Sequence, residues 1–317
     1  MITFGPVPSR RLGRSLGINN IPPKACSYAC VYCQVGATLE RISVPRAFYA
    51  PEEVLADVES RLQASAKAGA KIDYLTFVPD GEPTLDINLG TIIRMLRRFD
   101  IPIAVISNGS LLWREEVRER LQDVDWLSVK VDTTDEPCWR KLNRPEPSLG
   151  LSRVLTGIRG MSETFQGRLH SETMLLAGIN DSDDSVKGVA DYLAGLALER
   201  SYLAVPTRPV LDARVRIPHE AVLNRAYQLL SERLPRVEYL IGYEGDDFVS
   251  TGEPAEDLLA IAAVHPLREE AVRSLLKQRG ADWSLVERLL AGGELKLTEY
   301  QGIRYYVRRP GIVTAPV

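Results

Sequence analysis

Three of the four cysteines in this 317-residue chain fall within eight positions, at Cys26, Cys30 and Cys33. A closed zinc site needs four ligands, usually in two paired groups, and the spacing here offers no second pair. Cys138 stands alone, and the three histidines are scattered along the sequence. Three thiolates on a four-iron cluster would leave one iron without a protein ligand, and a substrate or cofactor could fill that position. The spacing therefore favours an iron–sulfur site over structural zinc.

The composition is that of an ordinary globular protein, with 39 basic and 42 acidic residues. This near balance argues against a chain held to nucleic acid by bulk charge, although a local basic face stays open. We find no apolar run of the roughly 18 to 20 residues that span a bilayer and no apolar signal-peptide core. We therefore expect a cytoplasmic protein with no membrane contact. Thiols stay reduced there, so clustered cysteines favour metal or redox chemistry over disulfides.

The elements that must position the cysteines alternate between short β-branched segments and longer segments of helical period. The expected strands are 15–21, 72–78, 101–107, 125–131, 168–176, 201–206 and 237–243, and the expected helices are 51–62, 89–99, 114–121, 185–196 and 220–234. Repeated βα units of this α/β kind predict a parallel sheet, either open or curled into a barrel. In both folds chemistry lies at the carboxyl ends of the strands.

The pattern changes after about residue 250. Three short helices are expected at 256–264, 268–278 and 284–291, followed by a hairpin at 294–309. Three helices and a hairpin predict a winged helix-turn-helix. We therefore expect three parts, a barrel domain over 1–245, a linker over 246–256 and a small winged-helix-like domain over 257–317.

The cysteine motif, with aromatic Tyr32 before its last cysteine, resembles that of the radical S-adenosylmethionine (radical SAM) enzymes. Those enzymes carry it after the first strand of a partial (β/α)6 barrel of the TIM type, and segment 15–21 precedes it here. The resemblance implies that Cys26, Cys30 and Cys33 hold a 4Fe–4S cluster whose open iron is chelated by S-adenosylmethionine. An electron passed to the sulfonium then gives a 5′-deoxyadenosyl radical.

A second motif follows the second expected strand. Asp80-Gly81-Glu82 resembles the family's Gly-Gly-Glu turn, which binds the methionine end of the cofactor. By composition alone this is a plain turn, but its place directly after a strand favours the cofactor role. By resemblance, further cofactor contacts come from Tyr32 in the cysteine motif and from later strand ends, at Ser107, Asn108, Lys130, Asp132, Thr173 and Val205. We also expect Lys130 to act in catalysis. The alternatives, a turn at Asn108 and an exposed charge at Lys130, stay open.

Within the superfamily, the chain resembles the branch that contains the wyosine-tRNA synthases and their bacterial relatives. The segments that carry this likeness are 7–19, 30–36, 141–145, 173–181 and 205–209. The wyosine synthases bind a second iron–sulfur cluster through additional N-terminal cysteines, whereas only Cys138 is left over here. We therefore do not carry their pyruvate condensation over to this chain.

Two substrate classes stay open. The first is RNA, favoured by the likeness, by the winged helix and by Arg10, Arg11, Arg14 and Lys24 near the cluster loop. The second is a peptide, a protein side chain or a small anionic metabolite, with the winged helix as a docking module. A DNA-binding redox sensor is disfavoured, because its reading helix would present few basic side chains. The implied partners are the substrate and a low-potential electron donor of the flavodoxin or ferredoxin type.

Two of the expected loops carry arginine directly before proline, at Arg144 and Arg208. Proline fixes its own backbone and restricts the residue before it, so each guanidinium is aimed. An aimed guanidinium suits a carboxylate or phosphate. We therefore expect Arg144 and Arg208 to act in catalysis by holding an anionic group of the substrate. The alternative is that both pair with carboxylates of the barrel.

Overall fold

The computed structural model describes residues 2–242, 248 and 253–308. Its strands are β1 (Thr3–Ser9), β2 (Gly13–Ile18), β3 (Ala25–Cys26), β4 (Glu40–Arg41), β5 (Tyr74–Phe77), β6 (Ile103–Ser107), β7 (Trp126–Lys130), β8 (Arg168–Met174), β9 (Arg200–Ala204), β10 (Val237–Leu240), β11 (Leu267–Arg268), β12 (Leu295–Tyr300) and β13 (Ile303–Arg308). Its α-helices are α1 (Pro51–Lys67), α2 (Leu89–Leu96), α3 (Glu115–Arg120), α4 (Glu136–Asn143), α5 (Leu151–Thr164), α6 (Asp183–Ala194), α7 (Glu220–Ser231), α8 (Pro254–Val264), α9 (Glu269–Gln278) and α10 (Ser284–Ala291).

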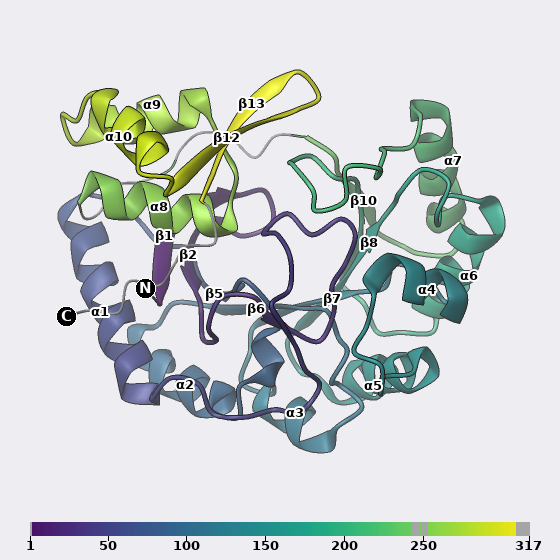
Figure 1. Cartoon of the computed structure of the whole chain (residues 1–317). Helices are drawn as coiled ribbons and strands as arrows, with labels where there is room; N and C mark the ends of the chain where they lie inside the picture. Colours follow the sequence, from purple (N-terminus) through teal and green to yellow (C-terminus); the bar gives the residue numbers. More distant parts are fainter. Residues whose placement is uncertain (1, 243–247, 249–252, 309–317) are drawn as a thin grey trace.

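The main sheet has the strand order β1-β2-β5-β6-β7-β8-β9-β10. All neighbours from β2 to β10 are parallel and follow the order of the chain. Helical crossovers connect them, as parallel βα units require. The strands form an arc with helices α1, α2, α3, α5, α6 and α7 around its outside (Figure 1). This confirms the predicted partial barrel, although α4 and α5 were not among the expected helices.

Strand β1 was missed by the sequence analysis and pairs antiparallel with β2 at the edge of the sheet. Its sequence, TFGPVPS, contains a glycine and two prolines, which are usually signs of a turn. Proline is tolerated on an edge strand, because one side of that strand needs no N–H for a neighbour. Phe4 of β1 covers Gly17 of β2, where a Cβ atom would lie only 2.1 Å from the Phe4 ring.

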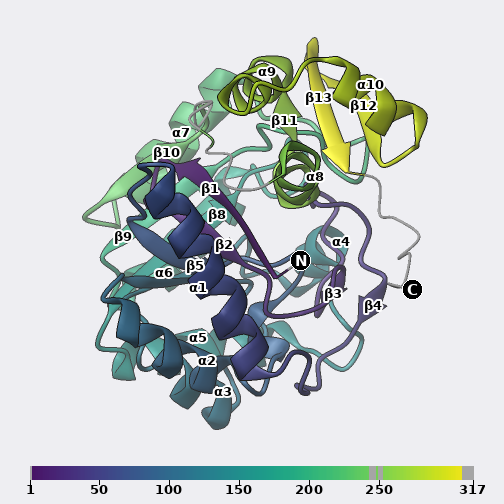
Figure 2. The same ribbon diagram turned by 90° about the vertical axis from the view of Figure 1, so that its left-hand side faces the viewer.

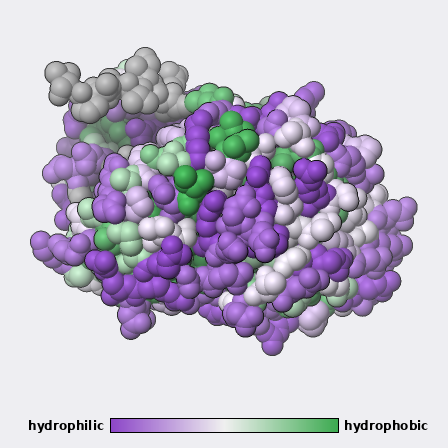
Figure 3. All heavy atoms as spheres, turned by 90° about the horizontal axis from the view of Figure 1, so that it is seen from below, coloured by the Kyte–Doolittle hydropathy of each residue, from purple (hydrophilic) through white to green (hydrophobic). Residues whose placement is uncertain are grey.

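The main hydrophobic core lies between the sheet and its outer helices. Val54 and Val58 of α1 and Ile92 and Ile93 of α2 are completely buried against it, as the period of an amphipathic helix predicts. The opposite helix faces meet solvent. Seen from below, this side of the molecule is mostly hydrophilic, with small and separate apolar patches (Figure 3).

The C-terminal part contains helices α8, α9 and α10 and a small sheet in the order β11-β13-β12. Strands β12 and β13 form the predicted antiparallel hairpin. Figure 2 shows helix α8 beside β1, with α9, α10 and the hairpin beyond it. That this part works as a winged helix stays a prediction.

The C-terminal part packs against the barrel. Phe4 and Val7 of β1 share one hydrophobic cluster with Leu258 and Ile261 of α8. Arg61 of α1 forms an ion pair of 2.6 Å with Asp257 of α8, and both side chains are largely buried. Because two parts of the chain build this cluster together, their cores are not separate.

The predicted linker, 246–256, lies largely outside the described residues. Helix α8 begins at Pro254, so its first turn falls within the predicted linker and before the predicted start of the last domain at residue 257. Proline suits a first helical turn, because no intrahelical partner awaits its missing N–H. Among the described residues, no helix is long and apolar enough to cross a membrane.

Candidate active site

The cysteine motif lies on the long connection between β2 and β5. Strand β3 ends at Cys26, and Cys30 and Cys33 follow in a segment without regular secondary structure. All three are free, half-buried thiols. The side-chain amide of Asn108 lies 3.7 Å from Cys26 Sγ, and that of Asn143 lies 3.5 Å from Cys30 Sγ. The loop after β6 and the end of α4 therefore converge on these sulfurs.

The cysteine thiols are neutral in the protein chain alone. Burial raises the pKa of Cys26 well above its ordinary value, and the nearby Glu82 carboxylate raises it further. Burial also raises the pKa of Cys30 to about 12, and it raises the pKa of Cys33. A thiol must lose its proton to become a metal ligand. Binding a cluster would therefore release the thiol protons, and the positive charge of the iron ions would take their place beside the thiolates.

The residues fit an iron–sulfur cluster better than a single ion. Within the described part of the chain, no three His, Cys, Asp or Glu side chains lie close enough together to hold one metal ion. A cubane is larger than an ion, so its three ligands stand further apart. The thiols of Cys26, Cys30 and Cys33 are near enough to raise one another's pKa. Amide donors to the sulfurs are also a usual feature of cluster sites.

The turn after β5 packs directly on the residues that precede Cys26. The amide of Glu82 donates to Ala25 O at 3.2 Å, and the amide of Lys24 donates to Asp80 O at 2.9 Å. At Gly81, a Cβ atom would lie 1.8 Å from the Ala25 carbonyl oxygen, so only glycine allows this approach. Lys24 Nζ also lies 3.4 Å from Asp80 Oδ2 in a buried ion pair. The two sequence motifs thus form one unit.

Glu82 is buried and gathers donors from two strand ends. Its Oε1 accepts from Thr84 Oγ1 at 2.6 Å and from Ser107 Oγ at 2.7 Å. Its Oε2 accepts from the Asn108 amide at 2.7 Å. Burial raises the pKa of this carboxyl, although the hydrogen bonds oppose the rise. Oε1 also accepts from the Thr84 amide at 3.1 Å, so three of the four donors fall on that oxygen and one on Oε2. Each carboxylate oxygen has about two acceptor sites, so Oε2 can accept one bond more.

Asp132 and Tyr32, two of the predicted cofactor contacts, are in direct contact. The Tyr32 hydroxyl donates a short hydrogen bond to Asp132 Oδ2. The Met174 amide donates to Asp132 Oδ1 at 2.8 Å, which fixes the carboxyl plane. Burial raises the pKa of Asp132, while the Lys130 ammonium opposes the rise. This carboxyl is therefore held between the cysteine loop and the ends of β7 and β8.

Thr173 and Val205 are the remaining predicted cofactor contacts. The Thr173 hydroxyl donates to Val131 O at 2.8 Å, so it ties β8 to the end of β7. Val205 is buried just beyond β9 and belongs to the main core. Their contact with a cofactor stays a prediction.

Lys130 belongs to a largely buried ion network, centred on Glu172, that the sequence analysis missed. Glu172 accepts from Lys130 Nζ at 2.5 Å and from Arg11 Nη1 at 2.8 Å. The Arg11 guanidinium lies over the rings of Trp126 and Tyr202, at 5.5 and 5.6 Å from their centroids. Burial alone would raise the pKa of Glu172, but the two cations hold it at about 2. Glu172 lies directly opposite Lys130 in the register of β7 and β8, which was the available signal.

Arg144 has a partner within the barrel domain. It is the C-cap of α4 with a φ of 45°, and its Nη2 lies 3.3 Å from Asp212 Oδ2. Arg214 shares the same carboxylate at 2.7 Å. This pairing matches the alternative that the sequence analysis left open, while 41% of the Arg144 side chain remains exposed.

Arg208 lies where the barrel meets the C-terminal part. Its guanidinium contacts Gln34 Oε1 at 3.4 Å and His265 Nε2 at 2.5 Å. The hydroxyls of Tyr300 and Tyr305 donate to the carbonyls of residues 206 and 207, at 3.1 and 3.2 Å. The hairpin and the end of α8 thus fix the loop after β9, which carries one of the predicted substrate contacts.

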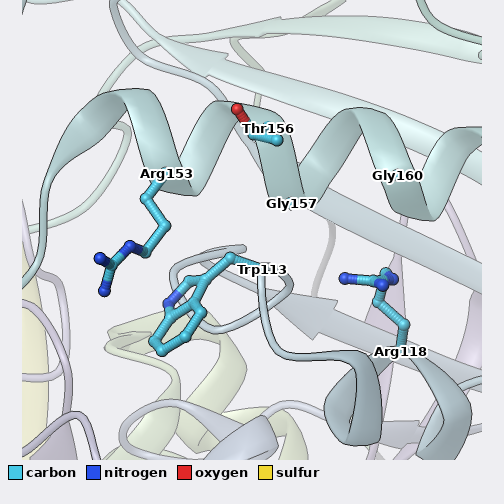
Figure 4. A pocket seen from close by; sticks show the side chains of 6 residues that line it. All are labelled: Trp113, Arg118, Arg153, Thr156, Gly157 and Gly160. Atoms are coloured by element: carbon cyan, nitrogen blue, oxygen red, sulfur yellow. The ribbon is translucent and has the colours of Figure 1, made fainter.

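A separate cavity of about 420 Å³ lies between α5 and the loop after β6 (Figure 4). Its lining includes Trp113, Arg118 and Arg153, and the Arg153 guanidinium lies 4.8 Å from the centroid of the Trp113 ring. Gly157 and Gly160 of α5 complete the facing side, and Gly157 lets the backbone of the loop approach the helix, since a Cβ atom there would lie 2.1 Å from Trp113 N. None of the predicted site residues lines this cavity, so its volume is no guide to the thiol site.

Comparison with known proteins adds the family. The sequence model of the radical SAM superfamily matches residues 20–192. The UPF0026 protein MJ1312 of Methanocaldococcus jannaschii is 43% identical, over 97% of this chain and 96% of that protein. A probable GTP 3′,8-cyclase of Pyrococcus horikoshii is 23% identical, over 50% of this chain and 47% of that protein. The crystal structure of a radical SAM methyltransferase from Sphaerobacter thermophilus matches with a TM-score of 0.54 and 21% identity, over 72% of this chain and 66% of that one.

Proposed function

Since this chain belongs to the radical SAM superfamily, we propose that Cys26, Cys30 and Cys33 are the ligands of its cluster. The chain is an enzyme of this class, and its cofactors are a 4Fe–4S cluster and S-adenosylmethionine. When bound, they supply one-electron cleavage of the sulfonium to a 5′-deoxyadenosyl radical that removes a hydrogen atom from a substrate. We assign Cys138 no part in this, because its Sγ already donates to Ile179 O at 3.4 Å.

The groups around the thiols are proposed to hold S-adenosylmethionine. Backbone carbonyls of the turn at 80–82 and the remaining acceptor site of Glu82 suit an ammonium group. Ser107 and Asn108 position Glu82, since both donate to its carboxylate. The Asp132 carboxylate, held by Tyr32, suits a ligand hydroxyl. These residues orient a charged cofactor, and orientation is a large part of what a protein contributes to radical chemistry.

One observation carries this proposal. The backbone at 24–25 is hydrogen-bonded to the turn at 80–82, so the first cysteine and the proposed methionine-binding turn form a rigid unit. The test is to reconstitute the cluster anaerobically, reduce it and measure 5′-deoxyadenosine. Slow cleavage without substrate supports the proposal, and an intact, reduced cluster that cleaves nothing contradicts it. We propose that the natural reductant is a donor of the flavodoxin or ferredoxin type. In this assay, such a donor should support the same cleavage as a chemical reductant such as dithionite.

For the substrate, we propose a nucleotide within RNA, with tRNA first to be tested. The 23%-identical relative from Pyrococcus is named for action on GTP, which is a nucleotide. The C-terminal part contacts the loop after β9, so a polymer bound to it would lie beside that loop. Adding tRNA to the reduced enzyme should raise 5′-deoxyadenosine formation and change the mass of one nucleoside. No change with tRNA from any source would contradict this proposal.

A small anionic metabolite is the second candidate, and burial of two basic residues favours it. Arg11 and Lys24, expected to help bind RNA, are instead largely buried in ion pairs with Glu172 and Asp80. Only Arg10 and Arg14 of that group are exposed. A free nucleotide or carboxylate that raises 5′-deoxyadenosine formation where tRNA does not would favour this candidate.

A further inference from the structure

Helix α4 ends against the cysteine loop, and its last residue, Asn143, is buried there. The amide of Ala29 donates to Asn143 O at 3.0 Å, and the amide of Val31 donates to Leu142 O at 2.9 Å. Tyr28 also forms an isolated bridge with Pro145. The backbone on both sides of Cys30 is therefore fixed by residues 142–145, which the sequence analysis singled out only for the family likeness and for Arg144.

The Asn143 side chain has an orientation that its neighbours dictate. Its Nδ2 lies 2.8 Å from Asp132 Oδ2, and an ionised carboxylate can only accept, so the NH2 group must face it. The same Nδ2 lies 3.5 Å from Cys30 Sγ and 3.2 Å from the Tyr32 hydroxyl. One N–H is thus directed to Asp132, and the second faces the sulfur and the hydroxyl. An ionised sulfur is the stronger acceptor of these two.

We propose that Asn143 is a positioning residue that sets the reduction potential of the cluster. This inference rests on the proposed assignment of Cys30 as a cluster ligand. An N–H directed at a cluster sulfur stabilises the added negative charge of the reduced state, and such bonds are one of the means by which proteins set cluster potentials. Asp132 holds the amide in place, so the donor cannot turn away from Cys30. Removing the Asn143 amide therefore makes the cluster harder to reduce.

The competing explanation is that Asn143 only joins α4 to the cysteine loop. A matched control distinguishes the two, because Asn180 is equally buried and also bonds to Asp132. Its amide donates to the backbone carbonyls of Asp132 and Met174, both at 2.8 Å, instead of to a sulfur. Loss of either amide loosens the same region, but only loss of Asn143 removes a donor from Cys30.

The experiment is a redox titration, followed by EPR, of the full-length, anaerobically reconstituted protein. Asn143→Leu removes the donor, and Asn143→Asp keeps the size but turns an acceptor toward the sulfur. Both are expected to retain iron and to shift the potential to more negative values, with the larger shift for Asn143→Asp. Asn180→Leu is expected to keep the wild-type potential. Equal potentials in all four proteins, or an equal shift in Asn180→Leu, would overturn the inference.

Should neither Asn143 variant fold, the wild-type protein provides the test. With ¹⁵N in its asparagine side chains, the reduced cluster should show a nitrogen coupling in pulsed EPR that disappears when the label is confined to the backbone. The coupling should persist in Asn108→Ala, which removes the other side-chain amide near a cluster sulfur. Absence of this coupling would overturn the inference. A wild-type protein that binds no cluster would instead refute the proposed function, so the two failures are distinguishable.

Discussion

Replacing Glu172 by Gln should destabilise the protein more than its single missing charge suggests. The Glu172 side chain is 9% exposed and lies between two cations, Lys130 and Arg11. These cations lower its pKa from the ordinary value of 4.5 to about 2. At 1.36 kcal/mol per pH unit, this fall corresponds to about 3 kcal/mol of stability at pH 7. Breaking a buried ion pair typically costs about the same.

The measurement is chemical unfolding of the cluster-free protein under reducing conditions over a series of pH values. Because the folded pKa lies below the unfolded one, the carboxylate of Glu172 stabilises the fold fully only above about pH 4.5, and this contribution is lost as the pH falls through about 2. The difference between wild type and Glu172→Gln should therefore be about 3 kcal/mol at pH 7 and about 1 kcal/mol at pH 3.

Glu199→Gln is the matched control. Glu199 pairs with Arg236 at the surface, where its side chain is 40% exposed, and exposed ion pairs contribute about 0 to 1 kcal/mol. If Glu172→Gln costs no more than this control, or if its cost does not decline in acid, the reasoning about the buried network is refuted.

Three further perturbations follow from the structure. Gly81→Ala should cost about 1 to 3 kcal/mol of stability and weaken S-adenosylmethionine binding by cluster-loaded protein, since the new Cβ atom would meet Ala25 O. Thermal unfolding measures the stability, and equilibrium dialysis measures the binding. The control Gly150→Ala has open space around its new Cβ atom and should change neither quantity. Ending the chain after residue 252 should expose Phe4 and Val7, at about 2 kcal/mol each, and cause aggregation in sedimentation analysis; a monomeric product of full stability would show that the shared cluster is dispensable. Arg144→Leu and Arg208→Leu should each leave 5′-deoxyadenosine formation without substrate unchanged. Each should also abolish the rise in 5′-deoxyadenosine formation that the substrate causes, and a normal rise would mean that the arginines are structural.

The parallel sheet was predictable because each strand is a short β-branched run and each crossover has helical period. These are local patterns, and they survive in the structure. Strand β1 was not predictable, because its glycine and prolines indicate a turn unless the strand is known to lie at the edge of the sheet. The shared cluster of β1 and α8 was also hidden, since nothing local distinguishes a residue that packs on its own domain from one that packs on another.

At the site, the cysteines and the Asp80-Gly81-Glu82 turn were singled out by residue type and spacing, and the structure places the two motifs in contact. The role of Gly81 in the approach to Ala25 needed the structure. Glu172 and Asn143 were missed, because an acidic residue in a strand and an amide at a helix end are common. Their importance comes from partners on other elements, Lys130 and Cys30, which only the fold brings near.

The central claim is that three thiolates of this chain hold one four-iron cluster. Iron and sulfide counted per chain after anaerobic reconstitution test it most directly. The wild type and Cys138→Ala should each bind about four irons and four sulfides. Alanine at Cys26, Cys30 or Cys33 should abolish the cluster while circular dichroism shows a retained fold. A full cluster in any of these three variants, or a second cluster in the wild type, would contradict the account.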